Sequence, residues 1–172
     1  RVTSRSFKLF YFLHRLSFRS LTGQTLDFGN FMLLKPSAAL RLREMPEAAA
    51  HIAAALLKSR AVIERVPTNR RARQIGDSKT GFEGLLAHSV AAHATFAERI
   101  LIRFGILNLI LTAIAAVAVA VVVAMRLLTN IPEPGWSTTV TGFLGLLVIQ
   151  LWAFWALAAL HLMGNRSIQN FL

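Results

Sequence analysis

Two long apolar runs near the end of the chain limit its fold more than any other feature. Phe104–Met125 contains no charged residue. As a helix with a rise of about 1.5 Å per residue it would reach roughly 33 Å, enough to cross a hydrocarbon core of about 30 Å. Thr141–Leu162 is a second such run, interrupted only by Gln150 and by His161 near its end. The pattern predicts two transmembrane helices.

The composition points the same way. Of the 172 residues, 55% are hydrophobic and only 16% are charged, and the mean hydropathy is +0.53. Soluble domains carry about 25% charged residues, so this apolar excess is expected inside membrane segments. The apolar content excludes a disordered chain, and the absence of cysteine excludes a disulfide scaffold. Because the chain begins at Arg1 without a Met or a signal-peptide pattern, we expect a piece of a longer protein.

The connection between the two runs predicts a tight antiparallel hairpin. Pro132, Pro134 and Gly135 cannot continue a helix, and Trp136 lies where an interfacial aromatic anchor is expected. Seventeen of the nineteen Lys and Arg residues precede Phe104. The positive-inside rule therefore places both termini in the cytoplasm and the short loop outside.

The net charge of +11 suggests an anionic partner. A chain with two spans already meets anionic lipid headgroups, so we expect membrane lipid as a partner and no nucleic acid. An ordinary solvated basic surface stays open for part of the first hundred residues.

The residues before the first span predict a mostly helical region. Arg5–Leu21 predicts a helix that is apolar around most of its circumference and has a basic stripe, which suits either the membrane interface or a domain core. Two strands are expected, over Phe31–Leu34 and Ala61–Val66. Between them we expect a helix with its N-cap at Ser37 that runs through Glu44, and a second helix from Pro46 to about Leu57. An ordered loop over Thr68–Thr80 and an amphipathic juxtamembrane helix over Gly81–Arg99 follow, and this helix is expected to lead directly into the first span.

Two local patterns are candidate binding sites. The stretch Thr68–Thr80 concentrates side chains suited to an anion, namely Arg70, Arg71, Arg73, Gly76, Ser78 and Lys79. Composition alone favours nonspecific contact with lipid headgroups over a specific site there. Asp27, Gly29 and Asn30 precede the first expected strand and could position a polar ligand, although turn capping is the commoner role.

The remaining polar residues predict little chemistry. The histidines are isolated or off a common helical face, so no metal site is indicated. Gln150 is expected to bond across the hairpin or to a neighbouring subunit.

The order of these patterns resembles the C-terminal part of membrane-bound, inverting family-two glycosyltransferases, in particular the polyprenyl-phosphate glycosyltransferases and dolichol-phosphate mannose synthase-like proteins. Those proteins show an aromatic helix, Asp-x-Gly-Asp-Phe-Arg, two helices, a strand ending in Val-Pro, Arg-x-x-Gly-x-Ser-Lys, a juxtamembrane helix and a two-span hairpin. The counterparts here are Phe7 to Phe18, Asp27 to Met32, Val66-Pro67, Arg73 to Lys79, Pro134 to Trp136 and Gln150. Asn30 and Met32 depart from the pattern, since many members have Asp and Arg there.

The resemblance implies an α+β membrane protein: a mostly helical fragment of a GT-A-type glycosyltransferase with a few short strands, a juxtamembrane helix and a transmembrane hairpin. The implied organisation is a C-terminal part of the catalytic domain over residues 1–80, the juxtamembrane helix over 81–103 and the hairpin over 104–172. The implied location is the bacterial inner membrane. A homo-oligomer is a further expectation, which the small Ala face of Ala113, Ala116 and Ala120 also favours.

The implied activity is transfer of a sugar from a nucleotide-sugar donor to a lipid-linked, polyprenyl-phosphate-like acceptor. The implied substrate-binding residues are Asp27, Asn30, Arg73, Gly76, Ser78 and Lys79. A divalent cation, Mg or Mn, is expected for the full-length enzyme, with its Asp-x-Asp ligands outside this segment. The alternative is a non-catalytic two-span module that binds anionic lipid or scaffolds a partner.

Overall fold

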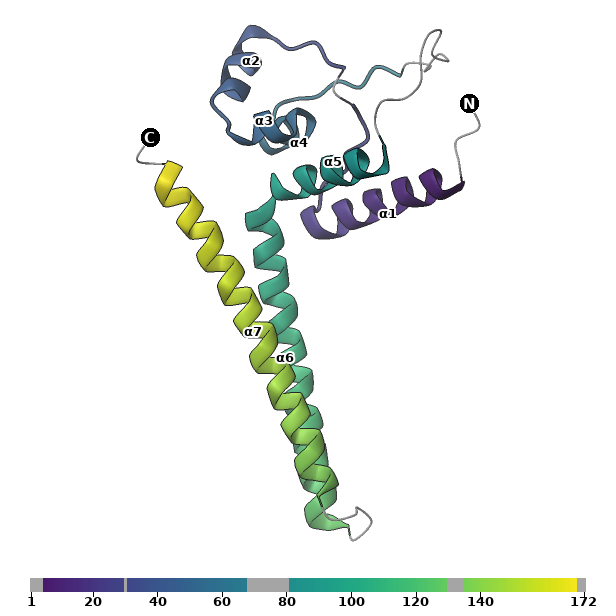
Figure 1. The fold of residues 1–172 in the computed structure, drawn as a ribbon, viewed down its shortest axis with the longest axis vertical. Helices are drawn as coiled ribbons and strands as arrows, with labels where there is room; N and C mark the ends of the chain where they lie inside the picture. The colour runs from purple at the N-terminus through teal and green to yellow at the C-terminus, as the bar shows by residue number, and fades with distance from the viewer. Residues whose placement is uncertain (1–4, 30, 68–80, 130–134, 170–172) are drawn as a thin grey trace. The chain divides into compact units, whose positions relative to one another are not determined.

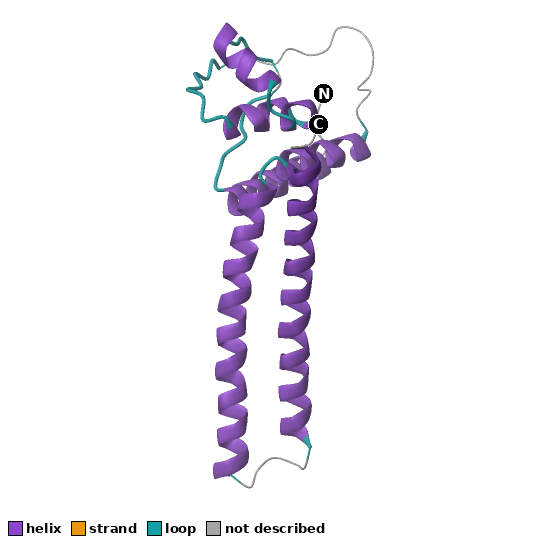
Figure 2. Ribbon diagram, turned by 90° about the vertical axis from the view of Figure 1, so that its left-hand side faces the viewer, coloured by secondary structure: helices purple, strands orange, loops and turns teal. Residues whose placement is uncertain are grey.

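The computed structural model describes residues 5–29, 31–67, 81–129 and 135–169, and in these ranges the regular structure is helical (Figures 1 and 2). The helices are α1 (Arg5–Thr22), α2 (Pro36–Arg43), α3 (Glu47–Ala50), α4 (Ile52–Lys58), α5 (Phe82–Ala94), α6 (Ala97–Leu128) and α7 (Trp136–Gln169). The chain divides after Ala97 into two compact units. We call them the N-terminal unit, which contains α1 to α5, and the hairpin unit, which contains α7 and nearly all of α6.

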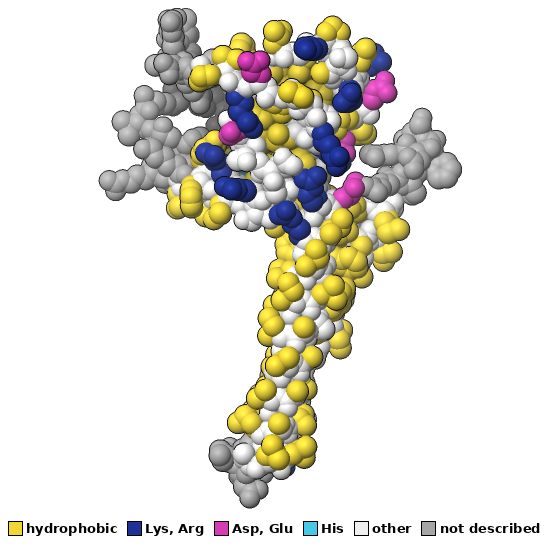
Figure 3. Space-filling view, turned by 180° about the vertical axis from the view of Figure 1, so that it is seen from behind, with side chains coloured by type: hydrophobic (Ala, Val, Ile, Leu, Met, Phe, Trp, Pro, Cys, Tyr) yellow, Lys and Arg dark blue, Asp and Glu magenta, His cyan; other side chains and the backbone are white. Residues whose placement is uncertain are grey.

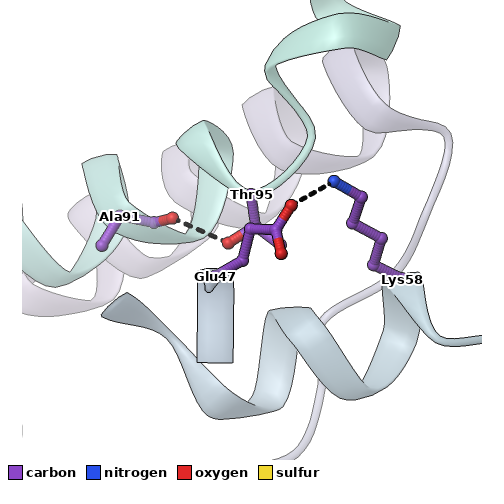
Figure 4. A network of polar contacts seen from close by, with 4 residues as sticks. All are labelled: Glu47, Lys58, Ala91 and Thr95. Carbon is purple, nitrogen blue, oxygen red and sulfur yellow. Dashed lines mark hydrogen bonds and ion pairs between the residues drawn. The ribbon is translucent and has the colours of Figure 1, made fainter. Parts of the chain in front are cut away.

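Two small apolar clusters hold the N-terminal unit together. In the first, Phe18 of α1 packs with Ala54 of α4, with Ala92 near the end of α5 and with Phe96 just after that helix. In the second, Leu42 of α2 packs with Ala55 and Leu56 of α4. The alanines let the helices approach closely, and α1 and α5 lie side by side (Figure 1). A salt bridge connects α3 to α4: Lys58 Nζ donates a hydrogen bond to Glu47 Oε1 at 2.6 Å (Figure 4).

The two expected strands are not present; the described parts of the chain contain no strand. Side chains in these segments still alternate as strand side chains do. Phe31, Leu33 and Val62 are fully exposed, whereas Met32, Leu34 and Ile63 pack against the Leu42 cluster. A strand is defined by hydrogen bonds to a neighbouring strand, and neither segment has such a neighbour among the described residues. The prediction of two strands was therefore wrong, because the side chains alternate without a partner strand to pair with.

This alternation leads to a stability prediction for two adjacent leucines. Leu34→Ala is expected to cost about 1–2 kcal/mol, because the side chain is partly buried against the Leu42 cluster. Leu33→Ala, with its side chain fully exposed, is expected to change stability by less than about 0.5 kcal/mol. Urea-dependent proteolysis of the detergent-solubilised chain would measure both. Equal costs at the two positions would contradict the packing described here.

Three helix boundaries differ from the sequence-based expectation. The N-cap of α2 is Lys35 rather than Ser37, because Pro36 occupies the first position of the helix, where proline is favoured. The expected helix from Pro46 to Leu57 is broken at His51, whose φ of −154° and ψ of 92° are extended. The juxtamembrane helix ends at Ala94, and α6 begins after Thr95 and Phe96, so α5 does not run directly into the first span.

The hairpin unit has two helices that are long and apolar enough to cross a membrane, Ala97–Leu128 and Trp136–Gly164. Both expected spans lie inside them. Only 11% of the most apolar window of the first and 0% of the second is buried, whereas the core helix of a soluble protein is mostly buried. Figure 3 shows the apolar side chains along the surface of this unit.

Indole and amide groups link α6 to α7. Trp155 Nε1 donates to the Leu101 carbonyl at 2.8 Å, Trp152 Nε1 donates to Thr112 Oγ1 at 2.9 Å, and Asn108 Nδ2 donates to the Leu151 carbonyl at 3.1 Å. Gln150 is exposed and takes part in none of these bonds, so it does not bond across the hairpin as one alternative expected. Both tryptophans serve as donors because an indole N–H in an apolar medium needs an acceptor.

Candidate functional site

The described part of the predicted substrate site centres on Asp27. This carboxylate lies in the loop after α1, where Arg65 of the loop after α4 meets it. Arg65 Nε donates to Asp27 Oδ1 at 2.9 Å, and the guanidinium lies 6.0 Å from the centre of the Phe28 ring. The side chains of Arg65 and Asp27 are 53% and 34% exposed, so the pair is accessible to a ligand.

The geometry of this pair leaves capacity for an anion. A guanidinium has five N–H donors, and the bond to Asp27 is made by Nε alone. The two terminal nitrogens are chemically suited to a bidentate contact with a phosphate, while Asp27 holds the group in place. An exposed ion pair of this kind contributes little to stability, about 0.2–1 kcal/mol, so its value here is in positioning.

Sequence reasoning found Asp27 but not Arg65. Asp27 was recognisable from its position in a turn-rich stretch, whereas Arg65 lies within the segment Ala61–Val66 that was expected to be a strand. The two are 38 residues apart, and no local pattern joins them. The other predicted site residues, Asn30, Arg73, Gly76, Ser78 and Lys79, lie outside the described residues.

A second candidate surface is the outer side of α1 and α5. Leu9, Phe12, Leu13 and Leu16 of α1 are exposed, as is Val90 of α5. A groove between the two helices is lined by Phe10, Leu13, His14, Leu16, Ser17 and Ser89. Phe18 of the same helix is buried, so α1 contributes both to the core of the unit and to an apolar surface. The buried Phe18 agrees with a core helix, and a position of the exposed apolar side at the membrane interface stays a prediction.

Polar contacts beside this groove join α1 to α5. His14 Nδ1 and Ser89 Oγ are 2.6 Å apart, and Ser17 Oγ lies 3.2 Å from His93 Nε2. His93 Nδ1 donates to the Ser89 carbonyl at 2.8 Å. The rings of His14 and His93 meet edge to face with their centres 5.5 Å apart. Histidines that are isolated in the sequence are therefore neighbours in the fold.

A second pair of histidines joins α4 to α5. His51 is 4% exposed, and its Nδ1 accepts a hydrogen bond from the Ala54 N–H at 3.1 Å, which caps α4. The ring of His88 stacks on it with centres 4.1 Å apart. Burial, and then the neighbouring His88, lower the pKa of His51 to about 4. Burial, followed by His93 and His88, also lowers the pKa of His14.

No set of three His, Asp or Glu side chains in the described ranges is arranged to hold a metal ion. The divalent cation implied by the resemblance therefore has no ligand set in this part of the structure.

No protein-family model, no curated protein and no solved structure matches this chain.

Proposed function

We propose that the chain is the membrane-anchoring C-terminal part of an inverting glycosyltransferase. The full-length enzyme would move a sugar from a nucleotide-sugar donor to a lipid-linked, polyprenyl-phosphate-like acceptor at the cytoplasmic face of a bacterial inner membrane. The observation that carries the proposal is the ordered series of motifs from Asp27 to the hairpin. The contact between Asp27 and Arg65 supports it, because it joins the first of these motifs to the residue directly before Val66-Pro67.

The proposed mechanism depends on placing cations near two phosphate groups. Negative charge develops on the leaving nucleoside diphosphate, and Arg73, Lys79 and the Arg65 guanidinium would offset it. A lipid phosphate is already an anion, so its attack on the anomeric carbon needs little general-base assistance. Ser78 would donate a hydrogen bond, Gly76 would permit a close turn, and Asp27 and Asn30 would shape the sugar or acceptor end. The hairpin would keep the site at the level of the lipid headgroups.

Substitution in the cationic stretch tests the proposal. In the full-length protein in native membranes, Arg73→Ala and Lys79→Ala are each expected to lower sugar transfer to lipid at least about tenfold, which corresponds to the loss of about 1.4 kcal/mol of transition-state stabilisation. Arg41→Ala is the matched control, since Arg41 is an exposed cation of α2 outside all the motifs. Unchanged transfer in Arg73→Ala and Lys79→Ala would remove both residues from the site.

The second candidate is a non-catalytic module that binds anionic lipid or scaffolds a partner. The exposed apolar side chains of α1 and the exposed Lys and Arg of the N-terminal unit favour it (Figure 3). It predicts binding to anionic vesicles that weakens with added salt, with no sugar transfer in the full-length protein. The small residues Ala113, Ala116 and Ala120 are exposed on α6, which leaves them available for a homo-oligomer under either proposal.

A further inference from the structure

Four imidazoles meet where α5 contacts α1 and α4. We call His14, His51, His88 and His93 the histidine cluster. His14 comes from α1, His51 caps α4, and His88 and His93 lie on α5. The other charged residues on these elements and on α3 are Arg5, Lys8, Arg15 and Arg19 of α1, Glu83 of α5, and Glu47 and Lys58, which pair with each other. The ion pairs of the N-terminal unit are Arg43–Glu44, Glu47–Lys58 and Asp27–Arg65 among the described residues, and none of them includes a cluster histidine.

One observed contact of the cluster needs a neutral imidazole. His51 Nδ1 is an acceptor for the Ala54 N–H, so the proton of the neutral ring is on Nε2. A second proton would have to bind Nδ1, which would remove the cap of α4. It would also place an imidazolium 4.1 Å from the His88 ring. On the other side of α5, protonating both His14 and His93 would place two like charges with ring centres 5.5 Å apart.

We propose that the histidine cluster makes the contacts of α5 with α1 and α4 acid-sensitive, so that proton uptake separates these helices. Separation would free the apolar side chains that now face one another, including Phe18 and Phe96, whose rings are 5.6 Å apart. The inference is independent of the proposed function, because it concerns only how the N-terminal unit is held together.

The direction of the pH dependence follows from linkage. The pKa of His51 is lowered in the packed state to about 4, from an ordinary value of about 6.5. The separated state therefore binds more protons between these two values, and the packed state loses stability as the pH falls through that window. For His51 alone, lowering the pH from 7.5 to 5.0 is expected to raise the ratio of separated to packed molecules roughly 30-fold. The lowered pKa of His14 acts in the same direction.

Hydrogen exchange of the whole chain in lipid nanodiscs tests the proposal, after correction for the intrinsic pH dependence of amide exchange. Between pH 7.5 and pH 5.0, peptides from α1, α4 and α5 are expected to lose protection, by roughly 30-fold in the opening constant. Peptides from α6 and α7 serve as the internal reference and are expected to stay protected. Equal protection of α1, α4 and α5 at the two pH values would overturn the proposal, and so would an equal loss in α6 and α7.

Two substitutions decide whether the histidines cause the effect. His51→Asn keeps a side-chain acceptor at the N-cap but cannot bind a proton in this range, so it is expected to remove most of the loss at pH 5.0. His14→Asn is a second, independent variant on the opposite side of α5 and is expected to reduce the loss in α1. His161→Gln, in the hairpin unit, is the control and is expected to respond like the native chain. A full pH response in both Asn variants would overturn the proposal.

Discussion

Val117→Arg is expected to prevent stable insertion of the first span. Val117 lies near the middle of α6, and its side chain is exposed. An arginine at the centre of a transmembrane helix costs about 2.5–3.5 kcal/mol on insertion scales, while valine contributes a few tenths favourably. The total of about 3 kcal/mol corresponds to more than a hundredfold in the insertion equilibrium. Alkaline extraction of membranes from cells that express the chain would measure the membrane-bound fraction.

The same substitution distinguishes a membrane hairpin from a water-soluble one. In water, an arginine at an exposed position of a helix is nearly neutral and improves solubility, so a soluble chain would tolerate the change. Val62→Arg is the matched control, because Val62 is fully exposed in the N-terminal unit and lies outside both apolar helices. It is expected to leave the membrane-bound fraction unchanged. A Val117→Arg chain that is extracted no more easily than the native chain would contradict two transmembrane helices.

The features that were predictable from the sequence are those that depend on neighbouring residues. The apolar runs around Val117 and Phe154 identify α6 and α7, because hydropathy over about twenty residues decides whether a helix can cross a bilayer. The spacing of Phe82, Leu86 and Val90 likewise identifies α5. For such elements no knowledge of distant contacts is needed.

The features that were missed depend on contacts between distant residues. The short apolar run Phe31–Leu34 is typical of a strand, but a strand needs a partner that local sequence does not reveal. His14 and Ser89 are 75 residues apart, so nothing in their local sequences indicates the contact between them. The break at His51 has the same origin, since its ring both caps α4 and stacks on α5.

The residues of the candidate site also differ in whether the local sequence reveals them. Asp27 is a candidate from the sequence because turn residues are recognisable locally, and its role in binding substrate stays a prediction. Arg65 is a candidate only because the tertiary fold brings it to Asp27. In the hairpin, the expected donor Gln150 is exposed, while Trp155 makes a bond across the two helices. Which side of a uniformly apolar helix faces its neighbour cannot be read from periodicity when nearly every side chain is apolar.

Gly105→Val is expected to destabilise the hairpin by about 2–3 kcal/mol. A Cβ at Gly105 would lie 2.9 Å from Trp155 Nε1 and 3.2 Å from Trp155 Cε2, which is too close for a side chain. The indole would have to move and lose its hydrogen bond to the Leu101 carbonyl. Overpacking costs about 1–3 kcal/mol, and a hydrogen bond between membrane helices contributes about 0.6 kcal/mol on average. Unfolding of the reconstituted hairpin by SDS titration would measure the change.

Gly145→Val separates this contact from the general effect of replacing a helical glycine. Gly145 lies on α7, and a Cβ there would meet no atom within 4 Å, so its replacement by valine is expected to change stability by less than about 0.5 kcal/mol. Combining Gly105→Val with Trp155→Ala provides a second comparison, because the valine then has space where the indole was. The double variant is expected to be more stable than the sum of the two single losses implies, which measures the coupling between the positions directly. Strictly additive losses would show that Gly105 and Trp155 do not meet, and the pairing of α6 with α7 at this level would be wrong.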